Sequence, residues 1–292
     1  MKQFKKLVRP YCLVLFILTI IPMLLILLYA FVEKGTSVTT FSFTFDNFIR
    51  FVDPIFINVM FRSFVLGIIS TIVCLFLGYP IAYGITKCSE KMQTVLILLI
   101  TFPTWINLLM RTYAWISILS NKGIISNLLI SIGLEPVDLL YTDFAVVLGM
   151  VYNFLPFMIL PIYTVLTKLD YSLQEASFDL GASPIKTFMK VVFPLSMGGV
   201  VTGITMVFLP SVSAFVVPKL LGGGQYALIG SFIEQQFIKI GNWHFGSAIS
   251  LILAVLVVLS MFGIYRVEKR IGTSNEEDRD EKTKKLSKRL TD

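Results

Sequence analysis

The residues of this chain whose types and spacing favour a specific task lie in a polar stretch, 168–194, between two long apolar segments. Ser172 and Glu175 have the spacing of a capping box, in which a hydroxyl and a carboxylate accept hydrogen bonds from free backbone N–H groups at a helix start. Gly181 stands where a helix end favours a left-handed residue, and Ser183 with Pro184 can start the next helix. The stretch, which we call the elbow, is therefore predicted to form two short helices joined at a glycine.

The remainder of the chain offers little that could carry out catalysis. The glycine run 222–224 lacks the lysine of a phosphate-binding loop. The single histidine, His244, has no acidic neighbour in sequence, and the three cysteines suggest neither a disulfide nor a metal framework. We therefore expect a non-catalytic chain that binds no metal or cofactor of its own, so that ATP, if used, is hydrolysed by another polypeptide.

Composition places the chain in a lipid bilayer. Of its residues 55% are hydrophobic and 15% charged, and the mean hydropathy is +0.80, far more apolar than a soluble domain. A spanning helix needs roughly 20 mostly apolar residues, and the segments of that kind are 10–32, 63–86, 92–119, 144–167, 195–218 and 245–265. Arg111 interrupts the third segment, and none contains Asp or Glu, which weakens the interpretation as a proton-coupled carrier. The expected fold is an all-α integral membrane protein with six transmembrane helices and the elbow between the fourth and fifth.

Small residues and prolines punctuate these segments. Glycines in the second and fifth segments permit neighbouring helices to approach closely, and prolines interrupt helical hydrogen bonding. The residues concerned are Gly67, Gly78, Gly199, Gly203, Pro103, Pro156, Pro161 and Pro210. Such sites suit helices that hinge or slide, and they also occur in static bundles, so both interpretations remain open.

The distribution of Lys and Arg predicts the orientation, because these residues mark the cytoplasmic side. One set of loops and ends contains Lys2, Lys5, Lys6, Arg9, Lys87, Lys91, Lys168, Lys186, Lys190, Arg266, Lys269 and Arg270, and the opposite loops contain only Lys34, Arg50, Arg62, Lys122, Lys219 and Lys239. Both termini and the elbow are therefore expected in the cytoplasm. The chain divides into 1–60, with the first span and an outer loop, the core 61–265, and the tail 266–292. Mixed charges in the tail favour a disordered segment over a nucleic-acid-binding arm.

The elbow resembles the EAA loop of permease subunits of ABC importers, the binding-protein-dependent type I permeases with a MetI-like transmembrane domain. The family pattern is Glu-Ala-Ala, three residues, Gly, nine residues, then Ile-x-Leu-Pro. This chain matches it with Glu175, Ala176, Gly181 and Pro194, and departs conservatively with Ser177, Val191 and Phe193. In that family the loop docks on a cytoplasmic ATPase subunit and transmits its motion, so the resemblance implies a coupling role for these residues and for Asp179. An amphipathic loop helix lying on the lipid headgroups remains an alternative.

Two other segments resemble the spermidine/putrescine branch of these permeases, and its B type more than its C type. The first is Arg-Thr-Tyr-Ala-Trp at 111–115, after Phe-Pro-Thr-Trp at 102–105. The second contains Gly222, Gly223, Asn242 and Trp243, and His244 follows where the family usually has proline. The resemblance covers about residues 60–265. It implies that the chain is a protein of the bacterial cytoplasmic membrane. Its implied partners are a second related permease, two cytoplasmic ATPase subunits and an extracellular binding protein that delivers polyamine.

Aromatic and small polar side chains in or beside the spans are candidates for the substrate path. Aromatic faces can bind polycations through contacts worth about 0.5 to 2 kcal/mol. The candidates are Trp105, Tyr113, Trp115, Tyr152, Asn153, Ser211 and Ser213. For each single ring an aromatic belt at the membrane interface is the favoured explanation. For the polar groups, interhelical hydrogen bonding explains their presence as well as a path does. Arg111 should repel a polycation, which favours a structural role for it.

Two alternative functions remain open from the sequence. The first keeps the importer class and changes the solute to an oxyanion, a ferric ion or another small molecule, because the elbow is common to these importers and Arg111 near the mouth suits an anion. The second is an ATP-independent carrier or channel, whose transport would persist without nucleotide.

Overall fold

The computed structural model describes residues 2–33, 42–224 and 228–266, and the predicted tail beyond Arg266 lies outside them. Within these residues the chain is helical, and extended pairing is confined to an isolated antiparallel bridge between Val32 and Phe43. The prediction of an all-α protein is therefore confirmed for the part of the chain that the structure describes.

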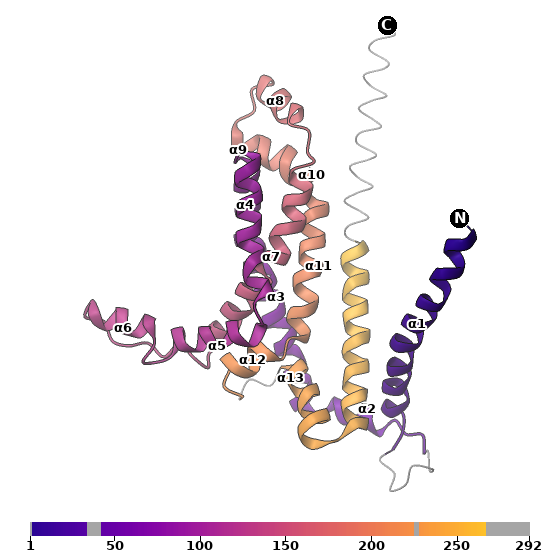
Figure 1. The fold of residues 1–292 in the computed structure, drawn as a ribbon. Coiled ribbons are helices and arrows are strands. Elements are labelled where there is room, and N and C mark those ends of the chain that lie inside the picture. Colours follow the sequence, from indigo (N-terminus) through magenta and orange to yellow (C-terminus); the bar gives the residue numbers. More distant parts are fainter. Residues whose placement is uncertain (1, 34–41, 225–227, 267–292) are drawn as a thin grey trace.

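Three helices pack side by side and form what we call the central bundle (Figure 1): α3 (Pro54–Thr86), α7 (Asp143–Leu166) and α11 (Met197–Ser213). Two of them begin at a side-chain cap. The Asp53 carboxylate accepts a hydrogen bond from the Ile55 N–H at 2.9 Å, and the Thr142 hydroxyl accepts one from the Ala145 N–H at 3.2 Å. These caps satisfy backbone donors that have no partner within the helix, so the starts of α3 and α7 are fixed locally.

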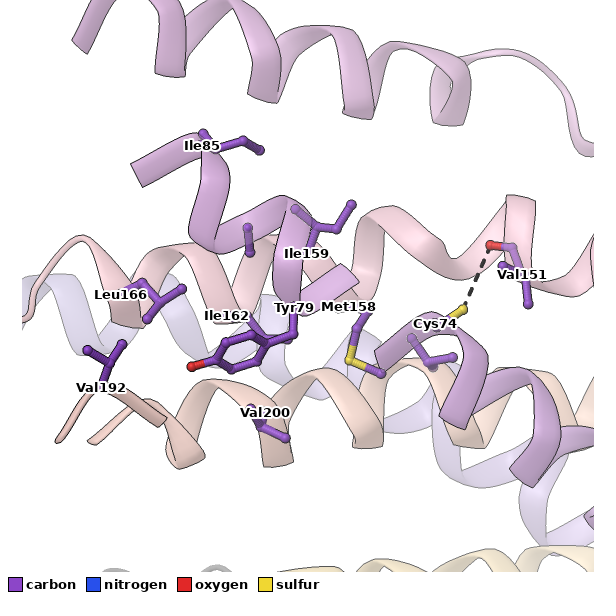
Figure 2. Packing of buried hydrophobic residues seen from close by; sticks show 12 residues of the cluster. Cys74, Tyr79, Ile85, Val151, Met158, Ile159, Ile162, Leu166, Val192 and Val200 are labelled. Carbon is purple, nitrogen blue, oxygen red and sulfur yellow. Dashed lines mark hydrogen bonds between the residues drawn. The ribbon is translucent and has the colours of Figure 1, made fainter. Parts of the chain in front are cut away.

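Close contacts at glycines hold the central bundle together. A Cβ atom added at Gly199 would lie 2.8 Å from the Pro161 carbonyl oxygen, and one added at Gly203 would lie 2.7 Å from the Met158 sulfur. Figure 2 shows the surrounding apolar cluster, in which Met158 is fully buried and Cys74 Sγ lies 3.8 Å from the Val151 carbonyl oxygen. The predicted close approach of helices at these glycines is confirmed.

Several helices are long and apolar enough to cross a membrane. Among the described residues, α3, α7 and the last helix, Trp243–Arg266, meet this criterion alone, and two bent helix pairs bring the number to as many as five. The first helix, α1 (Lys2–Ala30), has a shorter apolar part, Val14–Ala30. Together these helices describe a multi-pass membrane protein.

The third predicted span, 92–119, which Arg111 interrupts, is not a single helix in the structure. Helix α4 (Glu90–Thr101) continues through η2 (Phe102–Trp105), after which the chain turns by 93° into α5 (Leu108–Leu119) and α6 (Ile124–Ser131). Pro103 lacks an N–H for the helical ladder, and the Asn107 side chain accepts a hydrogen bond from the Leu109 N–H at 2.8 Å, which starts a new helix. Figure 1 shows α5 and α6 running sideways from the end of α4.

The fifth predicted span, 195–218, is also interrupted. Helix α11 ends at Ser213, because Ala214 is extended, and the short helix α12 (Val216–Leu221) follows. At its other end α11 is bent by 63° from the preceding helical segment, which comprises α9 (Pro184–Thr187), the π-helix η3 (Phe188–Val192) and α10 (Phe193–Leu195). The span therefore carries a break at both ends.

Helix α1 stands apart from the central bundle and meets the rest of the chain near its C-terminal end (Figure 1). There the Asn47 amide donates hydrogen bonds to the Ala30 and Val32 carbonyl oxygens, both at 3.2 Å. The His244 ring lies edge-on to Tyr29, with 5.3 Å between ring centroids, and its Nδ1 is 3.3 Å from the Tyr29 carbonyl oxygen. His244 thus has a structural contact with α1.

The short elements gather at the end of the bundle opposite the elbow (Figure 1): α2 (Asp46–Ile49), η1 (Arg50–Val52), α12, α13 (Ile229–Glu234) and the π-helix η4 (Gln235–Ile240). The start of α1 and the end of the last helix lie toward the elbow end instead. One end of the bundle is therefore covered by short helices, and the other carries the elbow.

Candidate functional site

The elbow has the two-helix form predicted from its sequence. Helix α8 (Ser172–Asp179) and α9 are joined at Gly181, which has a φ of +77°. The Gly181 N–H donates to the Phe178 carbonyl oxygen at 2.8 Å, closing the end of α8 as expected for a left-handed glycine. The Ser183 hydroxyl then accepts a hydrogen bond from the Lys186 N–H at 3.4 Å and caps α9.

The predicted capping box at the start of α8 is wrong. Ser172 is the first helical residue and not the cap, and the Asp170 carboxylate accepts a hydrogen bond from the Ser172 N–H at 3.0 Å. Hydrogen bonds from the Ser172 backbone and then from its side chain hold the pKa of Asp170 below its usual value. Asp170 lies two residues before Ser172, a spacing at which an aspartate side chain readily accepts a hydrogen bond from the backbone. The side chain of Glu175 therefore takes no part in capping.

A hydrogen bond between hydroxyl groups holds the two elbow helices together. Ser177 Oγ lies 2.9 Å from Thr187 Oγ1, and Thr187 is buried. Glu175, Ala176 and Asp179 are exposed on α8, and the Glu175 carboxylate has no hydrogen-bond or ion-pair partner among the described residues. The predicted coupling residues therefore divide into Ser177, which fixes the elbow internally, and an outward-facing set.

Apolar side chains of the elbow also point outward. Leu180 and Ile185 are 89% and 78% exposed, far more than the buried Thr187 between the helices. Pro194, by contrast, is half-buried within α10. Exposed apolar and acidic side chains therefore lie together on a projection whose helices are capped and hydrogen-bonded to each other.

A group of aromatic residues joins the elbow to the central bundle, and the sequence did not reveal it. The Tyr79 hydroxyl is 2.7 Å from Ser196 Oγ, and the Tyr79 ring lies 5.6 Å from the Phe188 ring and 5.5 Å from the Phe193 ring. Figure 2 shows Tyr79 pointing toward the α11 side of the cluster. The four-residue spacing of Tyr79 and Tyr83 was the available signal, since it places both on one face of α3.

The structure brings together some of the predicted path residues. Trp115 and Tyr152 lie 5.4 Å apart, edge-on, at the contact of α5 with α7. Asn153 is 3% exposed, and its amide donates to the Gly149 carbonyl oxygen at 2.7 Å while its Oδ1 has no partner among the described residues. Asn153 Oδ1 is therefore a buried acceptor with unused hydrogen-bonding capacity.

The other predicted path residues are separate from this pair. Trp105 and Tyr113 are 74% and 53% exposed on the outside of the chain. Ser211 is buried and Ser213 is exposed, and each hydroxyl donates to a backbone carbonyl of its own helix, at 2.7 and 3.0 Å. Within the described residues, the hydrogen bonds of both hydroxyls stay inside α11. Arg111 resembles Asn153 in having buried polar atoms without a partner. Its Nε and Nη1 are buried and have no hydrogen-bond partner in the described part of the chain.

The family-like outer segments have structural contacts. Gly222 follows the last residue of α12, and Gly223 has a φ of +67°, with the Tyr141 ring in the space that a Cβ would occupy. The Asn242 side chain accepts a hydrogen bond from the Phe245 N–H at 3.2 Å, and Trp243 packs edge-on against a neighbouring ring, Phe237, at 5.4 Å. These residues therefore shape the end of the bundle opposite the elbow.

Two ion pairs at that same end were not predicted. Arg62, in the third turn of α3, pairs with Asp143 at the start of α7 at 2.8 Å, and Lys219 of α12 pairs with Glu234 of α13 at 2.7 Å. Arg62 and Asp143 are 81 positions apart, a separation over which no sequence periodicity signals a contact.

Comparison with known proteins agrees with this architecture. Residues 1–273 match the family described as binding-protein-dependent transport system inner membrane component. The spermidine/putrescine transport system permease protein PotB of Haemophilus influenzae is 39% identical over 256 residues, which cover 87% of this chain and 90% of the relative. PotB of Escherichia coli K12 is 37% identical over 263 residues, or 89% and 95% of the two chains.

A solved structure shares the fold. It is a bacterial alginate ABC transporter in complex with a periplasmic protein bound to an alginate pentasaccharide. The similarity covers 92% of this chain and 94% of that chain, with a TM-score of 0.74 and 16% identity. The resemblance to ABC importer permeases of the spermidine/putrescine branch is confirmed by the family match and the relatives. The chain belongs to the family of binding-protein-dependent transport system inner membrane components.

Proposed function

We propose that this chain is a permease subunit of an ATP-driven importer and forms part of the membrane path for spermidine or putrescine. The observation that carries this proposal is its similarity, over nearly the full length of both chains, to spermidine/putrescine permeases. The chain is a non-catalytic membrane subunit and binds no cofactor, and ATP is hydrolysed by its partners.

The proposed assembly contains a second related permease, two ATPase subunits and a binding protein outside the cell. Six spans cross the bacterial cytoplasmic membrane, with α1 as the first and the bent α4 segment as the third. Both termini and the elbow lie in the cytoplasm, which agrees with the placement of the elbow, the start of α1 and the end of the last helix toward one end of the bundle (Figure 1).

The elbow is the proposed ATPase docking site. Its exposed surface combines Leu180 and Ile185 with the carboxylates of Glu175 and Asp179. Burying two large apolar side chains against a partner stabilises the contact by about 1.5 to 3 kcal/mol each, and the unpaired Glu175 carboxylate is available to a cation of the ATPase. Gly181 supplies the bend between the helix that carries the carboxylates and the helix that carries Ile185.

The proposed substrate path passes the Trp115–Tyr152 pair and Asn153. Ring faces attract a protonated amine, and the unpartnered Asn153 Oδ1 can accept a hydrogen bond from one. Replacing Tyr152 with alanine removes one of the two rings, so we expect a higher KM for spermidine with ATPase binding unchanged.

The decisive experiment reconstitutes this chain in proteoliposomes with its neighbouring permease, the ATPase and the binding protein. Spermidine uptake should require both ATP and the binding protein, and the Glu175→Arg variant should lose uptake together with copurification of the ATPase. Glu135→Arg is a matched control, because Glu135 is an exposed glutamate in the α6–α7 loop, away from the elbow. Normal uptake and copurification by Glu175→Arg would contradict the coupling proposal. ATPase stimulation by a different solute would replace the polyamine assignment and keep the importer class.

A further inference from the structure

Three residues at the end of α3 form a stripe toward the elbow. Tyr79, Tyr83 and Lys87 are spaced by four residues, which places them on one face of a helix. Lys87 is the C-cap residue directly after Thr86, the last residue of α3, so its ammonium also lies at the negative end of the helix dipole. None of these residues belongs to the loop motif or to the proposed substrate path.

Lys87 contacts the first part of the elbow. Its Nζ donates a hydrogen bond to Gln174 Oε1 of α8 at 3.3 Å. The same ammonium lies 5.1 Å from the centroid of the Tyr83 ring and 5.3 Å from that of the Tyr171 ring. One ring belongs to α3 and the other to the turn that begins α8, so Lys87 joins the two elements through cation–π contacts and a hydrogen bond.

Tyr83 and Tyr79 contact the last part of the elbow. The Tyr83 ring lies edge-on to Phe188 at 5.4 Å. Tyr79 contacts Phe188 and Phe193 and hydrogen-bonds to Ser196. The Tyr83 ring therefore contacts both the Lys87 ammonium and Phe188 of the π-helix that follows α9.

The stripe holds the elbow at both of its ends, while the docking surface between them remains exposed. Apart from Lys87, α8 contacts α9 and η3, and Ser177 hydrogen-bonds to Thr187 of α9. Among the described residues, Gln174 is the α8 residue whose side chain makes a polar contact with the end of α3, and that contact is with Lys87. The remaining route, from η3 into α11, passes through the 63° bend at Ser196.

We infer that Lys87 is a positioning residue for coupling, and that movement of α8 reaches the central bundle through Lys87 and the end of α3. This inference rests on the proposed docking of an ATPase on the elbow. Displacement of α8 draws Tyr171 and Gln174 with it, and the Lys87 contacts transfer that displacement to α3, which packs on both α7 and α11.

The test measures the number of ATP molecules hydrolysed per spermidine imported by the full reconstituted complex. Lys87→Met keeps much of the side-chain length but removes the charge and the hydrogen bond, and Lys87→Arg restores both. Tyr171→Leu removes the second ring, and Tyr171→Phe keeps it. We expect Lys87→Met and Tyr171→Leu to raise the ratio about threefold to tenfold, the factor by which loss of such contacts shifts an equilibrium, with the ATPase still copurifying. The Arg and Phe variants should retain nearly the native ratio.

The outcomes separate this inference from the proposal that it builds on. A native ratio in both Lys87→Met and Tyr171→Leu would overturn the inference, as would an equal rise in Lys87→Arg and Lys87→Met. If Lys87→Met fails to insert, the Tyr171 pair decides the result. Glu175→Arg serves as the reference: if it leaves uptake and ATPase binding intact, docking on the elbow itself is disproved, whatever the Lys87 variants do.

Discussion

The central bundle and the elbow are specified by different kinds of interaction. In the bundle, Gly199 and Gly203 let α11 come so close to α7 that a single added carbon would meet the backbone or side chains of α7. In the elbow, Gly181 has open space around it, and its requirement comes from a positive φ. The space between helices limits which residues the bundle can accept. Backbone conformation and a few hydrogen bonds determine the shape of the elbow.

This difference agrees with the roles proposed for the two regions. Close contacts in the bundle oppose repacking, which would open voids or create clashes. Local bonds in the elbow leave Leu180 and Ile185 exposed, where the proposed ATPase partner would bind. Substitutions at the two kinds of glycine therefore separate loss of fold from loss of coupling.

The largest expected effect is that of Gly199→Leu. Its Cβ would meet the Pro161 carbonyl oxygen and the Ile162 backbone, which cannot move aside without displacing α7. We expect a loss of about 3 kcal/mol or more in stability, measured as a lower thermal unfolding temperature in detergent and less inserted protein. Gly198→Leu is the adjacent control, since nothing lies within 4 Å of a Cβ at Gly198. Equal effects of the two variants would show that helix propensity, and not close approach, determines stability here.

A smaller effect is expected from Gly181→Val. A β-branched residue in the left-handed region costs about 1 to 2 kcal/mol, and the strain falls on the elbow alone. Bundle unfolding should change little, while ATP-driven uptake decreases several-fold. Gly181→Asn should be milder, because asparagine tolerates this conformation better. If valine and asparagine behave alike, the left-handed conformation is unimportant for coupling.

Breaking the hydrogen bond between α8 and α9 should lower the free energy of opening of the elbow by about 1 kcal/mol. Ser177→Ala leaves the buried Thr187 hydroxyl without its partner, and the elbow amides should exchange hydrogen faster by mass spectrometry. Adding Thr187→Val removes the unsatisfied group, so the double variant should recover part of the protection. Additive losses in the double variant would contradict this assignment.

The smallest effect concerns the Asp170 cap. The Ser172 hydrogen bonds favour the ionised carboxylate and lower the pKa of Asp170, so the contribution of the cap is complete at neutral pH and is lost only as pH falls through that lowered pKa. The part of the hydrogen-exchange protection of α8 that comes from the Asp170 carboxylate should therefore be constant between about pH 6 and 8. Asp170→Ala should increase hydrogen exchange in the first turn of α8, whereas Asp170→Asn, which keeps an acceptor oxygen, should not. Matching exchange in the two variants would refute the cap.

The sequence predicted the features that depend on neighbouring residues. The all-α class, the left-handed Gly181 and the cap at Ser183 all follow from local patterns and are confirmed. The errors arose where two local signals competed. Asp170 displaced Ser172 as the cap, and the Asn107 cap after Pro103 ended a segment that hydropathy alone presented as continuous.

Long-range partners could not be predicted from one sequence. Tyr79 and Ser196 are 117 positions apart, and neither residue type specifies the other. The same holds for Lys87 and Gln174, 87 positions apart. Polarity indicated that Asn153 was unusual, but its unsatisfied Oδ1 depends on how α7 packs.

The attachment of α1 has a consequence for how the chain can be altered. Because α1 meets the rest of the chain near one end, through Asn47 and His244, and its described side chains from Val14 to Tyr29 are mostly exposed, the packing of α3, α7 and α11 depends little on it. Substitutions along α1 should therefore leave that packing intact, whereas substitutions at Asn47 or His244 should loosen the attachment of the whole helix.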